Sequence, residues 1–301
     1  MIKKILLFLL LLFQAGCTFN NTEHLMALEK EANKHASHEG TIYRDLVYKS
    51  TLFHDIALDI YEPLIKKYKK APIYIYIHGG SWLHGNKALV NVYYKTVQKL
   101  REEGIAVVSI DYRYISQSGV EAIVSDCLDA VSFLQKNADK YALDPHFIGI
   151  HGHSAGANLA LLTGFNDSKK GNDIRFIVDE YGPTNVVKLL KEKEDRPFWT
   201  YFISDNTLNK LSPIEMIHKN IPPVYIVHGG SDHTVPIEQS QQLYKQLKEN
   251  GTEVYFQTVV GADHGYRGAD QEEVAKIREE VLAFMLKKFA GTLGLDEMPL
   301  R

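Results

Sequence analysis

A serine lies between a short apolar run and a helix-forming segment near the middle of this chain. The run at 147–150 predicts a buried strand, and a helix is predicted to begin at about Ala155. Between them is the pattern G-x-S-x-G at 152–156, with Ser154 at its centre. This pattern places a serine on a tight strand-to-helix turn, flanked by glycines because a Cβ would crowd the helix and strand. We therefore expect Ser154 to be a nucleophile beside a helix N-terminus, whose dipole favours a developing oxyanion.

Strands and helices alternate along most of the chain. Runs at 44–50 and 56–61 are predicted to form two antiparallel edge strands. Further strands are predicted at 73–77, 105–110, 147–150, 174–178, 223–227 and 253–259, and further helices at 93–103, 121–140, 237–249 and 271–288. This order predicts an α/β fold with a mostly parallel, eight-stranded sheet flanked by helices. Loops at the carboxyl ends of its strands are expected to carry the chemistry.

Length and charge limit the number of domains and the kinds of partner. The 301 residues, 45% of them hydrophobic, fit one large domain, which we predict at 41–290. Residues 184–221 lack a clean strand and are predicted to be a small lid insertion, whose aromatic residues are Phe198, Trp199, Tyr201 and Phe202. A polar tether is predicted at 18–40 and a tail at 291–301. The net charge of −3 gives no basic footprint for nucleic acid.

The amino terminus has the pattern of an export signal. A short basic start precedes an apolar run at 5–13, which is too short for a membrane span of about 20 residues. Residues 15–17 resemble a bacterial lipobox, with Cys17 as the lipidated first residue of an exported, membrane-anchored protein. Gln14 departs from that pattern, so cleaved secretion to the periplasm or outside the cell, or an uncleaved anchor, are the alternatives. In either processed form Cys127 is the only other thiol, which excludes an intramolecular disulfide.

An acid and a base follow the serine at later strand ends. Asp232 lies in a glycine-rich loop after one predicted strand, and His264 lies in the loop after the last. A serine hydroxyl needs a base to take its proton, histidine titrates in the right range, and a carboxylate fixes the imidazole tautomer. Asp263 is a rival to Asp232, but a neighbouring residue rarely folds back onto the adjacent ring. We predict a catalytic triad of Ser154, Asp232 and His264.

A second glycine-containing loop is expected to complete the oxyanion hole. His-Gly-Gly-Ser-Trp at 78–82 directly follows the predicted strand 73–77. Glycines at such a position let backbone N–H groups turn toward a ligand. We predict the backbone N–H of Gly80 or Ser81 as one donor and that of Ala155 as the other.

Several neighbouring residues have less specific predicted roles. Trp82 and His153 are expected to line the substrate pocket, while His78 is expected to brace its loop through hydrogen bonds. Asp111 and Arg113, after the predicted strand 105–110, are expected to form a structural ion pair.

Together these motifs resemble the α/β-hydrolase superfamily, in the esterase branch that includes hormone-sensitive-lipase-like, feruloyl-type and kynurenine-formamidase-like members. The matching residues are Leu58 to Pro63, His78 to Trp82, Asp111 to Arg113, Gly152 to Asn158, Asp232 with Val235 and Pro236, and His264 with Gly265. The resemblance covers about 41–288 and implies the α/β-hydrolase fold and the Ser–Asp–His order of the triad. Lipase-like members often have a third glycine where this chain has Ser81, so the loop looks more like the feruloyl-type and formamidase members.

These expectations lead to one preferred function and four alternatives. We expect a serine carboxylic-ester hydrolase for small or aryl acyl esters, including carbohydrate-linked acetyl or feruloyl groups, with no metal and no cofactor. The runner-up is an arylformamidase. A short-peptide exopeptidase, a non-catalytic binding protein and a metal hydrolase using His151, His153 and another histidine are the remaining alternatives.

Overall fold

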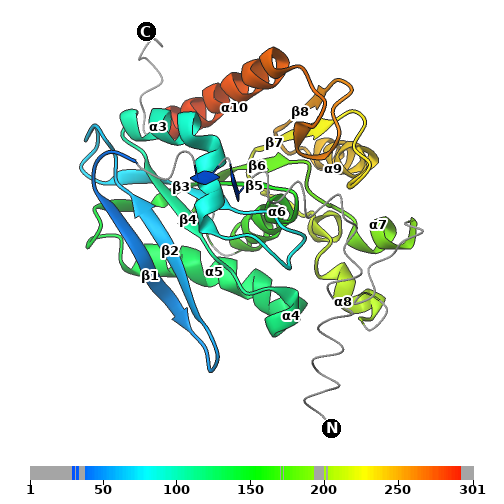
Figure 1. Ribbon diagram of the computed structural model, residues 1–301, viewed down its shortest axis with the longest axis horizontal. Coiled ribbons are helices and arrows are strands. Elements are labelled where there is room, and N and C mark those ends of the chain that lie inside the picture. The colour runs from blue at the N-terminus through cyan, green and yellow to red at the C-terminus, as the bar shows by residue number, and fades with distance from the viewer. Residues whose placement is uncertain are drawn as a thin grey trace.

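The computed structural model describes residues 29–30, 32–33, 38–169, 171, 173–192, 200 and 203–292. Within them, one eight-stranded sheet has the order β1-β2-β4-β3-β5-β6-β7-β8, with helices on both faces (Figure 1). The strands are β1 (Ile42–Ser50), β2 (Asp55–Tyr61), β3 (Ala71–Ile77), β4 (Ala106–Ile110), β5 (Leu143–His153), β6 (Ile174–Glu180), β7 (Val224–Gly229) and β8 (Val254–Val259). The β1–β2 and β2–β4 pairs are antiparallel and the other pairs are parallel, which confirms the predicted fold class.

The helices connect successive strands and cover the sheet. The α-helices are α3 (Tyr94–Glu102), α4 (Ile115–Ser118), α5 (Val120–Lys136), α6 (Ala155–Asp167), α7 (Val186–Glu192), α8 (Asp205–Asn209), α9 (Glu238–Glu249) and α10 (Gln271–Thr292). Short 3₁₀ helices are η1 (Lys87–Tyr93), η3 (Pro213–Met216) and η4 (His264–Tyr266). In the described part of the chain, no helix combines the length and the apolar character that a membrane span requires.

Strand β3 shows how the core is divided between the two faces of the sheet. Ile73, Ile75 and Ile77 are fully buried in the cluster that includes side chains of α5, α6 and α9. Tyr74 and Tyr76 alternate with them and are buried in the opposite cluster, with side chains of α3 and α10. Alternation along a strand sends successive side chains to opposite faces, so burial of both faces produces a continuous apolar and aromatic run.

The structure moves several predicted boundaries. Strand β2 lies between β1 and β4, so only β1 of the first two strands is at an edge. Strand β5 is longer than the predicted 147–150 and continues to His153, directly before the serine. Helix α5 ends at Lys136 rather than at 140, and α10 continues to Thr292 rather than ending at 288.

The predicted ion pair between Asp111 and Arg113 is wrong. Arg113 instead binds the fully buried Asp126 through Nε at 2.8 Å and through one terminal nitrogen at 2.7 Å. Lys49 also binds the same carboxylate, at 2.8 Å. Asp111 accepts a hydrogen bond from the backbone N–H of Lys87 at 2.7 Å. Both residues brace the region after β4, but through different partners.

Packing against the domain begins inside the predicted tether. Ala32 is buried in the cluster on the α3 and α10 face. His38 forms a 2.7 Å hydrogen bond with Asn91 of η1. The predicted insertion 184–221 lies between β6 and β7 and contains α7, α8 and η3. Its four aromatic residues, Cys17 with the predicted signal, and the tail from 293 all lie outside the described residues.

Candidate active site

Ser154 lies on the turn between β5 and α6 with a backbone conformation that side-chain-bearing residues rarely adopt. Its φ is 53° and its ψ is −124°, and its N–H donates a 2.8 Å hydrogen bond to the carbonyl oxygen of Glu180. A Cβ at Gly152 would overlap the carbonyl oxygen of Gly156, and a Cβ at Gly156 would overlap that of Ile77. The glycines of the predicted motif are therefore needed where α6 touches the ends of two strands.

The structure brings the three predicted triad side chains into one hydrogen-bonded chain. The His264 Nε2 atom lies 2.9 Å from the Ser154 hydroxyl oxygen. The His264 Nδ1 atom lies 2.7 Å from a carboxylate oxygen of Asp232. With the proton on Nδ1, His264 donates to Asp232 and leaves Nε2 to accept from the serine. Residues more than 100 positions apart are joined because β5, β7 and β8 end at the same edge of the sheet.

The Asp232 carboxylate is held ionised by its surroundings. Its other oxygen accepts hydrogen bonds from the backbone N–H groups of Thr234 and Val235, both at 2.8 Å. Burial alone would raise the pKa of Asp232, but the neighbouring His228 and His264 lower that pKa well below its usual range. The carboxylate is thus a fixed acceptor for the imidazole N–H.

Asp263, the rival orienting acid, has different partners. Its carboxylate accepts hydrogen bonds from the backbone N–H groups of His233 and His264, at 3.0 and 2.8 Å. It also pairs with Arg267 at 2.7 Å. Asp263 therefore shapes the loop that carries His264, while the carboxylate at the His264 ring belongs to Asp232.

The loop after β3 lies beside the start of α6, as the oxyanion-hole prediction requires. Gly156 of α6 packs directly on the end of β3, which brings the following loop close to Ala155. The Gly80 carbonyl oxygen accepts from the N–H groups of Leu83 and His84, at 2.9 and 3.0 Å, and closes a tight turn. Ser81 has a φ of 54° within this turn. Left-handed backbone at a non-glycine residue is concentrated at functional sites.

His78 and Trp82, at the two ends of this loop, are buried. His78 is fully enclosed, lies 2.7 Å from the Gly79 carbonyl oxygen through Nδ1, and stacks on Tyr112 with ring centroids 4.3 Å apart. Burial lowers the pKa of His78, which favours a neutral bracing imidazole. Trp82 is 6% exposed and has a φ of 59°. Contact between Trp82 and a substrate stays a prediction.

A buried polar cluster under Ser154 was not predicted from the sequence. His151 lies between Tyr74, at Nδ1, and the Glu180 carboxylate, 3.1 Å from Nε2. Tyr93 donates to the other Glu180 oxygen at 3.0 Å. Burial would raise the pKa of Glu180, but His151, Arg278 and Tyr93 outweigh it and lower that pKa to about 2. The same residue, Glu180, therefore carries a buried charge and holds the Ser154 N–H.

His153 belongs to the same region. Its Nδ1 lies 2.7 Å from the Tyr76 hydroxyl, and its ring stacks on that of Tyr76 with centroids 5.8 Å apart. A Cβ at Gly79 would overlap the His153 ring, so this histidine packs directly against the loop after β3. The predicted contact with substrate stays untested. Within the described residues, no group of three or more histidine, cysteine, aspartate or glutamate side chains could hold a metal ion.

Asp179, next to Glu180, gives the protein a testable pH dependence. One oxygen accepts from the Gly182 N–H at 2.9 Å, and within the described residues the other is buried without a partner. Burial raises the pKa of Asp179 from 3.8 to about 7. Between these values the unfolded chain is ionised and the folded chain is protonated, so the free energy of unfolding falls as the pH rises.

We expect Asp179→Asn to remove this pH dependence. The unaltered protein should lose on the order of 4 kcal/mol in free energy of unfolding as the pH rises from 3.8 to 7, because Asp179, with its raised pKa, must take up a proton on folding. The variant should not show this loss. Urea unfolding at several pH values measures the difference, and equal m-values in the two proteins serve as the control. Parallel pH dependences of the two proteins would contradict the assignment.

Comparison with known proteins gives the family. The family model described as BD-FAE matches residues 58–247. The chain is 26% identical over 248 residues to Esterase LipC of Mycobacterium tuberculosis, covering 76% of this chain and 61% of that protein. It is 27% identical over 230 residues to the isoprenylcysteine alpha-carbonyl methylesterase ICME of Arabidopsis thaliana, covering 69% of this chain and 53% of that protein. The chain thus matches less than two thirds of the length of these curated relatives.

A solved structure agrees with the family match. A truncated carbohydrate esterase from gut microbiota is 25% identical and superposes with a TM-score of 0.70, over 83% of this chain and 97% of that one. The BD-FAE match covers more than half of the chain and includes the serine, the acid and the loop after β3. The protein therefore belongs to the BD-FAE family and has the α/β-hydrolase fold.

Proposed function

We propose that the protein is a serine carboxylic-ester hydrolase that works through an acyl-enzyme. The observation that carries the proposal is the chain from the Ser154 hydroxyl to His264 at 2.9 Å and on to Asp232 at 2.7 Å. Ser154 precedes α6, a helix of 13 residues, and the N-terminus of a helix stabilises nearby negative charge.

Acylation follows from this geometry. As the Ser154 oxygen attacks the ester carbonyl carbon, its proton passes to His264 Nε2, and Asp232 stabilises the resulting imidazolium. The carbonyl oxygen becomes an oxyanion that accepts from the N–H of Ala155 and from the N–H of Gly80 or Ser81. His264 then returns the proton to the leaving alcohol oxygen as the ester C–O bond breaks, which leaves the acyl group on Ser154.

Deacylation repeats the same steps with water. His264 takes a proton from a water molecule whose oxygen attacks the acyl carbon, and a second oxyanion forms in the same donor set. Collapse of this intermediate expels the Ser154 oxygen, which recovers its proton from His264. The products are a carboxylic acid, an alcohol and the unchanged enzyme.

The proposed substrates are esters of small or aryl acyl groups, including acetyl or feruloyl groups attached to carbohydrate. Support comes from the His-Gly-Gly-Ser-Trp loop at 78–82 and from the 25% identical carbohydrate esterase. The same loop also favours an arylformamidase as the second candidate, because the resemblance noted for this motif includes formamidase-like members.

A substrate panel tests the proposal and separates the two candidates. We expect hydrolysis of p-nitrophenyl acetate, with kcat/KM above about 10⁴ M⁻¹s⁻¹ for the preferred acetyl or feruloyl ester. An N-formyl aryl amine should be cleaved at least tenfold more slowly than that ester. A preference for the N-formyl compound would make the formamidase the better assignment, and no turnover of any ester would refute the hydrolase proposal.

We also propose that the chain is exported and held at a membrane by a lipid on Cys17. The support is the basic start, the apolar run 5–13 and the Ala-Gly-Cys sequence at 15–17. Mass spectrometry of the mature N-terminus tests this location. A mature chain that begins at an acylated Cys17 is the expected result, and a chain that keeps Met1 would refute it.

A further inference from the structure

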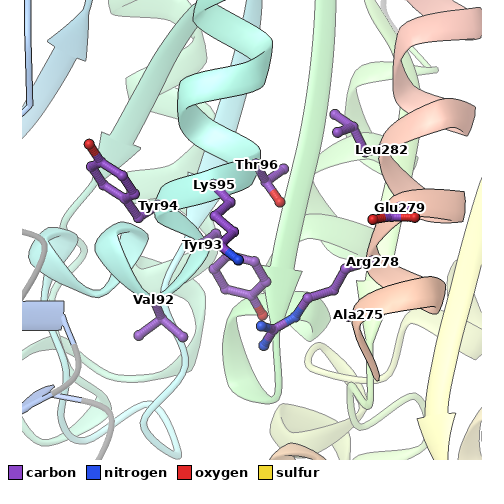
Figure 2. Close-up of a pocket in the computed structure, with 9 residues that line it drawn as sticks. All are labelled: Val92, Tyr93, Tyr94, Lys95, Thr96, Ala275, Arg278, Glu279 and Leu282. Atoms are coloured by element: carbon purple, nitrogen blue, oxygen red, sulfur yellow. The ribbon is translucent and has the colours of Figure 1, made fainter. Parts of the chain in front are cut away.

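A pocket lies between the start of α3 and the first half of α10, on the sheet face opposite α6. Its volume is about 530 Å³, within the range of small-molecule sites. Its walls include Val92 and Tyr93 on one side and Arg278 and Leu282 on the other (Figure 2). No residue of the triad or of the loop 78–82 lines it, so it is a separate site.

Arg278 gives this pocket an incompletely satisfied positive charge. Within the described residues, its Nε–H is buried and has no hydrogen-bond acceptor. The guanidinium lies 5.5 Å from the centre of the Tyr93 ring. Burial would lower the pKa of Arg278, but attraction to Tyr93 and Glu180 outweighs it and raises that pKa. Arg278 is therefore a firmly charged donor group.

The nearby acid does not complete the hydrogen bonds of Arg278. Both oxygens of the Glu180 carboxylate accept from other side chains, one from His151 at 3.1 Å and one from Tyr93 at 3.0 Å. Among the residues that the structure describes, no side chain or carbonyl oxygen forms a hydrogen bond with the guanidinium of Arg278, so an anionic ligand in the pocket would meet a charged group with free donor capacity. Planar carboxylates match the guanidinium fork with two parallel hydrogen bonds.

The other lining residues select the kind of anion. Figure 2 shows Lys95 and Arg278 extending from the two facing helices toward the same space, beside Tyr93. Val92 and Leu282 supply apolar walls. Glu279, which also lines the pocket and is exposed, opposes a second negative charge. These features favour a singly charged ligand with an apolar tail over a phosphate dianion.

We propose that this pocket binds a small amphipathic carboxylate, with its carboxylate on Arg278 and its tail against Val92 and Leu282. Lys95 attracts the same carboxylate from the exposed rim, where screening makes its contribution smaller than that of Arg278. The proposal does not depend on which ester the protein hydrolyses, because the site shares no residue with the triad.

Calorimetric titration with octanoate tests the proposal, with 1-octanol as the uncharged probe. Octanoate is expected to bind at one site with a Kd of about 1 mM or tighter, and at least tenfold more tightly than 1-octanol. Arg278→Met should weaken octanoate binding by about tenfold or more, because charge-assisted hydrogen bonds are lost. Glu279→Gln should strengthen it two- to threefold, because a like charge is removed.

A steric variant separates this pocket from the acyl site at Ser154. Ala275 is exposed on α10 and lines the pocket, so Ala275→Trp fills the space and leaves Arg278 in place. Octanoate binding should be lost in this variant, while its thermal midpoint and its p-nitrophenyl acetate turnover stay as before. Unchanged octanoate binding in Ala275→Trp, or a Kd above about 10 mM for the unaltered protein, would overturn the proposal.

Discussion

Ser154→Ala is expected to lower kcat for p-nitrophenyl acetate by about 10⁴–10⁶-fold. The loss is this large because the hydroxyl is the atom that forms the acyl-enzyme, and His264 then has no serine proton to accept at its 2.9 Å contact. What remains is the smaller acceleration that the oxyanion donors and binding provide. Initial rates on the purified variant measure the effect, and labelling by a fluorophosphonate probe should disappear with it.

A matched serine variant controls for general effects of the Ser154 substitution. Ser118→Ala changes a serine in α4 whose hydroxyl makes one long bond, 3.3 Å, to the Tyr114 carbonyl oxygen. We expect its turnover and fluorophosphonate labelling to match the unaltered protein. Esterase activity that persists in Ser154→Ala, in a preparation with an unchanged thermal midpoint, would show that another group is the nucleophile.

Asp232→Asn is expected to lower kcat by about 10⁴-fold with little change in the fold. An asparagine can present an N–H to His264 Nδ1, which then becomes an acceptor and places the imidazole proton on Nε2. That tautomer donates to the Ser154 hydroxyl and cannot take its proton. Steady-state kinetics on the variant measure the loss.

Asp263→Asn is the matched control, because Asp263 adjoins His264 and was the rival acid. Its carboxylate holds two backbone N–H groups and Arg267, so we expect a loss of activity below about tenfold. A larger loss for Asp263→Asn than for Asp232→Asn would reverse the assignment of the orienting acid.

The strand-end residues could be predicted from sequence because each one lies shortly after an apolar run. Ser154, Asp232 and His264 lie in glycine-containing loops, and parallel strands bring such loops to one edge of the sheet. The order serine, aspartate, histidine along the chain is the order typical of the α/β-hydrolase fold. Local pattern and topology together were sufficient for this part of the site.

The buried cluster under the serine could not be predicted in the same way. It depends on lateral register: Tyr76 of β3 is paired with His151 of β5, and His151 with Val178 of β6. Neither the strand order nor this register can be read from apolar periodicity. Tyr74 and Tyr76 lie within the predicted strand 73–77 with no sign of their partners, and Glu180 lies beyond the end of the predicted strand 174–178.

The prediction that Arg113 pairs with Asp111 was wrong for a related reason. Asp111 and Arg113 are close in sequence, but the carboxylate that Arg113 reaches is Asp126 on α5, which Lys49 of β1 also contacts. Three elements that are separate in the chain meet at this carboxylate, so proximity in sequence was a poor guide to the partner.

The contact of Gly156 with the end of β3 has a consequence for redesign of this protein. Because α6 rests on the Ile77 carbonyl oxygen with no side chain between them, the helix and the loop after β3 form one rigid block. The β6–β7 connection is tied to this block as well, because the Asn158 side chain of α6 donates to the carbonyl oxygens of Pro183 and Leu211, both at 2.7 Å. Substitutions at Gly152 or Gly156 would place a Cβ on backbone atoms of the neighbouring helix or strand, so variant libraries that include these positions would yield mainly misfolded protein.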